Sequence, residues 1–272
     1  MRNALLIIML ALAVNCPGAG AFAMPQVLVT NKSDSYITIV PLDKEHEGQL
    51  PSPLDQVSSE LPPGSFLLIN HRSAPINALV TLWSFVDNEG LSTEKRFNCD
   101  GYVALPSESI VKGNDSVLVT LDGCTMREFF LHMAAGGPML GGNPLRSPRN
   151  RDILQKATKL NAVQITIDSA IFADGMIWGP DKRRYYTDIV ARCSAIRTVG
   201  EEVSNAVSTG QPMAAILEKI GPQATEGSGG RESYLKRYYA GFLRRSPDPQ
   251  ATLKLYNEQA PLPEFRHVGE QK

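Results

Sequence analysis

The chain has 272 residues, of which 43% are hydrophobic and 20% are charged, so it is long enough for one large or two modest domains with a buried core. Its 27 Lys and Arg residues nearly balance its 28 Asp and Glu residues, which gives a formal net charge of −1. This balance argues against nucleic acid as a partner, because nucleic-acid-binding proteins usually carry a clear excess of basic residues.

Residues 1–23 have the features of a secretory signal peptide. Arg2 provides a positive n-region, residues 4–14 form an unbroken apolar run, and Ala21-Phe22-Ala23 matches the small-x-small pattern that signal peptidase cleaves. The apolar run is shorter than the about 20 residues needed to cross a membrane. We therefore expect a periplasmic or secreted mature protein with no transmembrane segment after cleavage. Acylation at Cys16 is the alternative.

Residues 27–122 show the short, turn-bounded apolar runs that are typical of β-strands. Residues 76–86 are apolar on both faces, which suits a central strand whose second face is covered by C-terminal helices. The alternation places on one face Ile76, Ala78, Val80 and Leu82, and on the other Leu79, Trp83 and Phe85. In residues 116–121, apolar and polar side chains alternate, so we expect one buried face. The expected strands cover residues 27–31, 36–42, 65–71, 76–87, 93–99 and 116–121. This spacing indicates a β-sandwich.

The strand pattern returns at residues 163–168, after a loop rich in glycine and proline at residues 134–151. Asp174-Gly175 favours a type I′ hairpin turn, with residues 176–178 as the returning strand. We expect this hairpin to rejoin the first sheet, so that the sandwich spans residues 24–180.

The apolar period becomes helical after Gly179-Pro180, and Asp181 is placed to cap the first helix. We expect a helical region at residues 181–260, packed on the sandwich, and a flexible tail at residues 261–272. Pro247 and Pro249 are expected to end the last helix.

Residues 234–245 form the most clearly amphipathic of the expected helices. We expect its aromatic half, which includes Phe242, to pack on a sheet face. The basic half would remain in water as a candidate partner-binding surface, and its residues are Lys236, Arg237, Arg244 and Arg245. The alternative is that this helix lies on a membrane or receives a partner.

Cys99 and Cys124 are expected to form a disulfide, because an exported protein meets an oxidising compartment and each cysteine ends or follows an expected strand. Sequence spacing alone does not fix the Cα separation of about 4.4–6.8 Å that such a bridge requires. Cys193 lies among apolar helix positions, which favours a buried side chain over a reactive nucleophile.

The chain lacks the Gly-x-Ser-x-Gly, His-Glu-x-x-His and Cys-x-x-Cys motifs of common hydrolases, metalloenzymes and redox proteins. His71 and His132 are the candidates for a general base, and each has a simpler structural interpretation. Asp168, Asp174 and Asp181 are an alternative ligand set for calcium, but they also suit an outward strand position, a turn and a helix cap. We therefore expect no catalytic residue, no cofactor and no metal.

Two runs resemble signatures of uncharacterised secreted bacterial proteins that have a signal peptide, an immunoglobulin-like β-sandwich and C-terminal helices. The first is Asn70-His71-Arg72-Ser73-Ala74-Pro75-Ile76-Asn77-Ala78, followed by Val80 and Trp83. The second is Ile165-Thr166-Ile167-Asp168, followed by Phe172, Asp174-Gly175 and Gly179-Pro180-Asp181. The resemblance implies an α+β fold in which an immunoglobulin-like antiparallel β-sandwich carries an appended C-terminal helical region. It implies no activity.

The function expected from the sequence is that of a non-enzymatic interaction or structural protein of the bacterial envelope. Its partner would be an envelope or extracellular protein of unknown identity. The alternative is a secreted hydrolase with an unrecognised carboxylate or histidine site.

Overall fold

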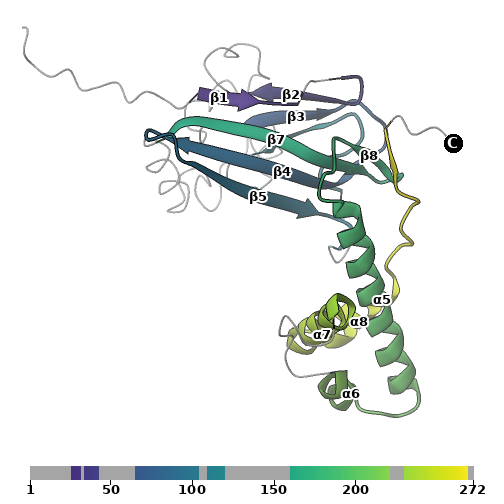
Figure 1. Ribbon diagram of the computed structural model, residues 1–272. Coiled ribbons are helices and arrows are strands. Elements are labelled where there is room, and N and C mark those ends of the chain that lie inside the picture. The colour runs from purple at the N-terminus through teal and green to yellow at the C-terminus, as the bar shows by residue number, and fades with distance from the viewer. Residues whose placement is uncertain are drawn as a thin grey trace, which may run out of the picture.

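The computed structural model describes residues 26–31, 34–42, 65–103, 109–119, 160–220 and 230–268. In these residues the fold is α+β, with two sheets that are mainly antiparallel and four helices (Figure 1). The expected signal peptide, the loop at 134–151, His132 and Cys124 lie outside the described residues.

The larger sheet is built around two long antiparallel strands, β4 (Ile76–Asp87) and β7 (Leu160–Phe172). Strand β4 has the bounds expected from the sequence. The hairpin formed by β7 and β8 joins the same sheet as β4, as expected. The other strands are β1 (Gln26–Val29), which is parallel to β7, and β5 (Ser92–Asp100), β8 (Met176–Trp178) and β9 (Arg266–His267).

The smaller sheet contains the antiparallel strands β2 (Ile37–Pro41), β3 (Phe66–Asn70) and β6 (Ser116–Val119). Buried side chains of both sheets form one core, which includes Phe66, Trp83 and Ile165. Strand β6 departs from the expected alternation because Leu118 is also fully buried. Both faces of β6 are therefore covered.

Strand β4 is covered on both faces, but its residues divide differently from the sequence expectation. The pairing of β4 with β7 shifts register between Ile76 and Ala78. Ile76 and Leu79 consequently belong to the core between the sheets, whereas Ala78 and Val80 belong to a second cluster against helix α5. A shift of one residue exchanges the faces of a strand, and alternation in the sequence does not reveal it.

Helix α5 (Tyr185–Ser208) begins at the end of the larger sheet and extends away from it (Figure 1). Tyr185, Ile189 and Cys193 in its first half pack on Ala78, Val80, Ile171 and Ile177 of the sheet. The expectation that C-terminal helices cover this face of the sheet is therefore confirmed for the first half of α5.

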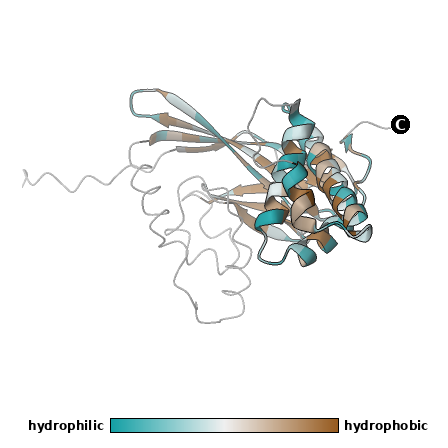
Figure 2. Cartoon of the chain, turned by 90° about the horizontal axis from the view of Figure 1, so that it is seen from below, coloured by the Kyte–Doolittle hydropathy of each residue, from teal (hydrophilic) through white to brown (hydrophobic). Residues whose placement is uncertain are grey.

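The remaining helices, α6 (Met213–Ile220), α7 (Gly230–Arg245) and α8 (Pro249–Asn257), gather beside the second half of α5, clear of the sheets (Figure 1). They share a separate core with α5 that contains Val199 and Leu243. Seen from below, both hydrophilic and hydrophobic residues occur along these helices, as their amphipathic packing requires (Figure 2). The expectation that residues 234–245 pack on a sheet is wrong. Helix α5 extends past the edge of the sheet, and residues 234–245 pack on that part of α5.

Helix α8 lies within the expected helical region, but the sequence analysis does not predict it as a separate helix, although its start is a recognisable signal. Asp248 accepts a hydrogen bond from the backbone N–H of Ala251 at 3.0 Å, and Pro249 occupies the first turn. Proline is favoured at the first helical position because its missing N–H has no partner there in any case. Pro249 therefore begins a helix as well as following the end of α7.

Residues 261–268, expected to be part of a flexible tail, return to the larger sheet instead. Strand β9 pairs with β8 in parallel, and the ring of Phe265 lies 5.9 Å from that of Tyr102. At the hairpin turn, a Cβ on Gly175 would lie 2.2 Å from the backbone oxygen of Glu264, and Gly175 has a φ of +85°. The turn therefore requires glycine both for its conformation and for the approach of this segment.

Candidate binding site

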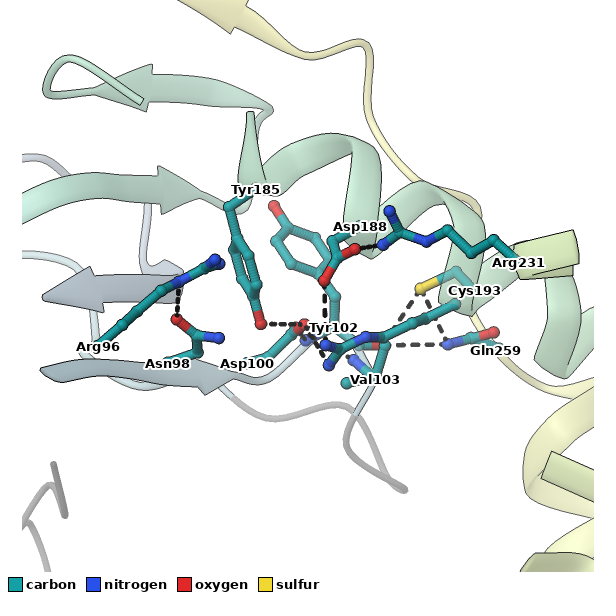
Figure 3. A network of polar contacts seen from close by, with 11 residues as sticks. Arg96, Asn98, Asp100, Tyr102, Val103, Tyr185, Asp188, Cys193, Arg231 and Gln259 are labelled. Carbon is teal, nitrogen blue, oxygen red and sulfur yellow. Dashed lines mark hydrogen bonds and ion pairs between the residues drawn. The ribbon is translucent and has the colours of Figure 1, made fainter. Parts of the chain in front are cut away.

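A cluster of polar side chains lies where the end of β5 meets the first half of α5 (Figure 3). The Asp100 carboxylate, 6% exposed, accepts hydrogen bonds from the backbone N–H groups of Tyr102 at 3.0 Å and Val103 at 3.4 Å. The Tyr185 hydroxyl donates to the same carboxylate at 3.2 Å. Burial raises the pKa of Asp100, although Arg192 and these hydrogen bonds oppose the rise. The cluster joins the sheet to the helix.

Aromatic and cationic groups enclose this carboxylate. The guanidinium of Arg96 lies 5.0 Å from the centre of the Tyr185 ring, and that of Arg192 lies 5.9 Å from it. Burial and the neighbouring Asp100 raise the pKa of the Tyr185 hydroxyl, which therefore remains a proton donor at neutral pH. The Tyr102 hydroxyl donates to the Phe172 backbone oxygen at 2.6 Å. The hydroxyl groups of Tyr102 and Tyr185 therefore both donate to groups of the protein itself.

Cys193 is buried at the same junction, as its apolar sequence neighbours indicated. Its thiol lies 3.8 Å from the Tyr102 backbone oxygen, and Gln259 donates from Nε2 to that oxygen at 3.0 Å and to Sγ at 3.4 Å. Burial, reinforced by Asp100, raises the pKa of the thiol to about 12. A thiol that stays protonated is a poor nucleophile, so Cys193 has a packing role.

Arg192 and Asp188 together connect this cluster to helix α7. Its Nη2 donates to Asp188 Oδ2 at 3.1 Å, and its Nη1 lies 3.9 Å from Asp100 Oδ2. Arg231, in the first turn of α7, also pairs with Asp188. Two guanidinium groups from two helices therefore share the Asp188 carboxylate.

A cavity of about 490 Å³ opens beside Arg192, between the end of β5, α5 and α7. Its wall is mainly aromatic, and Tyr238 and Phe242 are 45% and 47% exposed. The Tyr238 ring lies 5.2 Å from that of Tyr239 in an edge-to-face arrangement. Arg192 is the one charged residue among the described residues of the wall, which are Val103, Arg192, Tyr234, Leu235, Tyr238, Tyr239 and Phe242. We call this cavity the aromatic pocket.

The four basic residues predicted as a partner-binding surface do not form one group. Lys236 pairs with Glu202 of α5, and Lys236 and Arg237 line a different cavity, of about 500 Å³, between α5, α6 and α7. Arg244 and Arg245 are exposed at the end of α7. The expectation that Phe242 belongs to the buried half of this helix is also wrong. The buried residues of α7 are Leu235, Tyr239, Ala240 and Leu243.

The fold does not bring together the three aspartates considered as calcium ligands, because Asp174 lies apart from the neighbouring pair Asp168 and Asp181. Asp174 forms a two-bond ion pair with Arg72, whereas the Asp168 backbone oxygen accepts the Asp181 N–H at 2.7 Å. In the part of the chain that the structure describes, no group of three or more His, Cys, Asp or Glu side chains could hold a metal ion.

Asp168 is fully buried, so the expectation of an outward strand residue is wrong. It lies at a register shift between β4 and β7, where Val80 pairs with Ser169 and Thr81 with Ile167. The shift leaves Asp168 without a partner residue on β4, and its side chain instead accepts the Lys182 N–H at 3.1 Å. A bulge of this kind re-aims one side chain.

Asp181 accepts the Tyr185 N–H at 2.9 Å and so caps the start of α5, as expected, although Arg184 is the residue at the N-cap position. His71 lies on the surface with its Nε2 2.8 Å from Thr38 Oγ1, which agrees with a polar role in a turn. The hydrogen bonds of Asp181 and His71 therefore stabilise a helix start and a turn.

The two sequence signatures contact each other in the fold. The Arg72–Asp174 ion pair joins them with a shortest N···O distance of 2.7 Å, and the Arg72 guanidinium also lies 4.5 Å from the centre of the Phe172 ring. Asn70, fully buried, donates to the backbone oxygens of Ala74 and Lys112. Asn70, Arg72 and Asp174 therefore hold turns and strands together.

Searches against protein-family models, curated proteins and solved structures gave no match to this chain. Among the described residues, none of the helices has both the length and the apolar character needed to cross a membrane. The function is therefore inferred from the arrangement of the side chains. In the wall of the aromatic pocket, Val103 and Arg192 lie outside the amphipathic helix predicted from the sequence, because their place beside α7 depends on tertiary packing.

Proposed function

We propose that this chain is an exported, non-enzymatic interaction protein of a bacterial envelope, and that the aromatic pocket is its binding site. In this proposal the two sheets form an immunoglobulin-like sandwich that carries the helices. The observation behind it is the exposure of Tyr238 and Phe242, at 45% and 47%, in the wall of a single cavity. Aromatic side chains next to a concave surface are typical of binding sites, because they bury a large apolar area when a ligand enters.

The polar groups near the pocket favour binding over catalysis. Asp100 and Tyr185 are engaged with each other, and the Cys193 thiol is kept protonated. The other buried carboxylates, Asp168 and Asp181, are 0% and 3% exposed and accept backbone N–H groups. A general acid or base must lie within hydrogen-bond reach of its substrate. Asp168 borders a separate cavity of about 250 Å³, and neither Asp168 nor Asp181 lines the aromatic pocket.

Site-specific photo-crosslinking tests the proposal. A benzophenone amino acid is placed at Phe242 in the full chain, and the protein is irradiated in envelope extract. The matched control carries the same group at Leu91, an apolar residue that is 64% exposed near the β4–β5 turn. We expect adducts at position 242 and none at position 91, as measured by mass spectrometry. Equal labelling at both positions, or none at 242, would contradict the proposed function.

A further inference from the structure

We propose that the aromatic pocket binds a monomeric amphiphile with one anionic head group, such as a free long-chain carboxylate. Its apolar part would lie on Tyr238 and Phe242, and its head group would meet Arg192. This inference rests on the proposed function and specifies the chemistry of the ligand. Three features of the pocket carry it: its size, its aromatic wall and the position of its charge.

The size of the pocket suits a small molecule. Its volume of about 490 Å³ lies within the about 300–1,000 Å³ that is usual for small-molecule sites. Tyr238 and Phe242 are one helical turn apart on α7, so both rings border the same space. A hydrocarbon chain placed there would bury apolar surface that otherwise faces water. The wall therefore selects a ligand with a substantial apolar part.

The charge of the pocket selects the head group. Arg192 offers five N–H donors, and its ion pairs with Asp188 and Asp100 leave donors for a further oxygen. Asp188 is shared with Arg231, so a single carboxylate faces two guanidinium groups there. Asp100 already accepts hydrogen bonds from Tyr102, Val103 and Tyr185. A carboxylate ligand would add a charge-assisted hydrogen bond to Arg192.

The net charge of α7 also has the sign that attracts an anion, although none of its basic residues lines the pocket itself. The helix carries five basic residues and one acidic residue, Glu232. Aromatic walls also suit quaternary ammonium ligands through cation–π contact, but here Arg192 would repel a cation. The site therefore discriminates between an anionic and a cationic amphiphile of equal length.

Displacement of a fluorescent probe tests this discrimination. The full chain is saturated with 8-anilinonaphthalene-1-sulfonate and titrated with dodecanoate, dodecanol or dodecyltrimethylammonium below their micelle concentrations. We expect dodecanoate to displace the probe with an apparent Kd at least about tenfold lower than that of the cation, as like-charge repulsion at Arg192 requires. Equal displacement by all three compounds, or no displacement by dodecanoate, would overturn the inference.

Substitutions in the wall of the aromatic pocket test whether dodecanoate binds there. Tyr238→Ser and Phe242→Ser should each weaken dodecanoate binding about tenfold, because each removes an exposed aromatic contact surface without opening the core. Leu91→Ser is the matched control and should leave the Kd unchanged. Arg192→Gln should remove the preference for the anion, and Arg192→Lys should retain part of it. If Arg192→Gln does not fold, the two aromatic variants and the Leu91→Ser control still test the site. An unchanged Kd for dodecanoate in both Tyr238→Ser and Phe242→Ser would show that dodecanoate does not bind in the aromatic pocket.

A last arm separates a free amphiphile from a membrane lipid. We expect dodecanoate to bind and the protein to remain unbound in flotation with phosphatidylglycerol vesicles. Flotation with vesicles but no binding of dodecanoate would overturn the inference. Photo-adducts of protein size at position 242, together with no dodecanoate binding, would reject this ligand while supporting the proposed function. The absence of both adducts and dodecanoate binding would reject both.

Discussion

Asp181 combines a useful hydrogen bond with an unfavourable charge. Its side chain caps α5 through Tyr185, yet the residue is 3% exposed and the Asp168 carboxylate lies nearby. Burial, together with Asp168, raises the pKa of Asp181 above its ordinary value. The folded state therefore holds a proton on Asp181 more firmly than the unfolded chain does. Protonation of Asp181 therefore stabilises the folded state. This stabilisation is complete at pH values below the ordinary pKa of an aspartate, and it is lost as pH rises through the folded-state pKa of Asp181.

We expect Asp181→Asn to remove this pH dependence while keeping the cap. Asparagine retains the oxygen that accepts the Tyr185 N–H, and it tolerates the φ of +39° found at this position. Relative to the natural chain, the variant should gain stability as pH rises from about 3 to 7, because only the natural chain loses a stabilising proton over this range. Thermal unfolding measured across this range checks the result. A stability difference that is independent of pH would show that Asp181 titrates normally.

Asp174 provides a control of opposite sign. Burial alone would raise its pKa, but the hydrogen bonds from Arg72 and the Met176 N–H lower it overall. Its stabilising contribution is present above the ordinary pKa and is lost as pH falls through the folded-state pKa. Asp174→Asn should therefore lower stability at neutral pH, by about 1 kcal/mol or less for a partly exposed pair, and should have little effect at low pH.

At the scale of the element, the two apolar rows of α7 show what a sequence pattern can and cannot predict. The helical period predicted the helix, but Leu235, Tyr239 and Leu243 form one row with a spacing of four, and Tyr238 and Phe242 belong to the adjacent row. Both rows are apolar, so the pattern alone does not choose the buried one. Packing against α5 and α8 decides it. The aromatic pocket was missed for this reason.

Two neighbouring substitutions test this assignment. Leu243 is fully buried, so Leu243→Ala should lower the free energy of unfolding by about 2–5 kcal/mol. Phe242 is 47% exposed, and Phe242→Ala should cost less than about 1 kcal/mol, because the ring is already in contact with water. Chemical denaturation of both variants gives the comparison. Equal losses, or a larger loss for Phe242→Ala, would place the aromatic row in the core.

At the scale of the whole molecule, the strands were more predictable than their connections. The expected ranges locate all strands of both sheets apart from β9, because short apolar runs between turns are a local property. The register shifts at Ile76 and Asp168 were not predictable, since they depend on how β4 and β7 meet. The position of the helices was not predictable either, because the apolar stripe of α5 continues past the sheet into a second core.

This division predicts that the helices open before the sheets. Helices α6, α7 and α8 share their core with the second half of α5, whereas β4 and β7 are buried between the smaller sheet and the first half of that helix. Segments with separate cores can unfold at different free energies. We expect backbone amides of α7 and α8 to exchange with deuterium before those of β4 and β7, and Leu243→Ala to accelerate exchange in the helices alone. If that substitution accelerated exchange in β4 and β7 equally, the two cores would unfold as one cooperative unit, with the α5 junction around Asp100 transmitting the change.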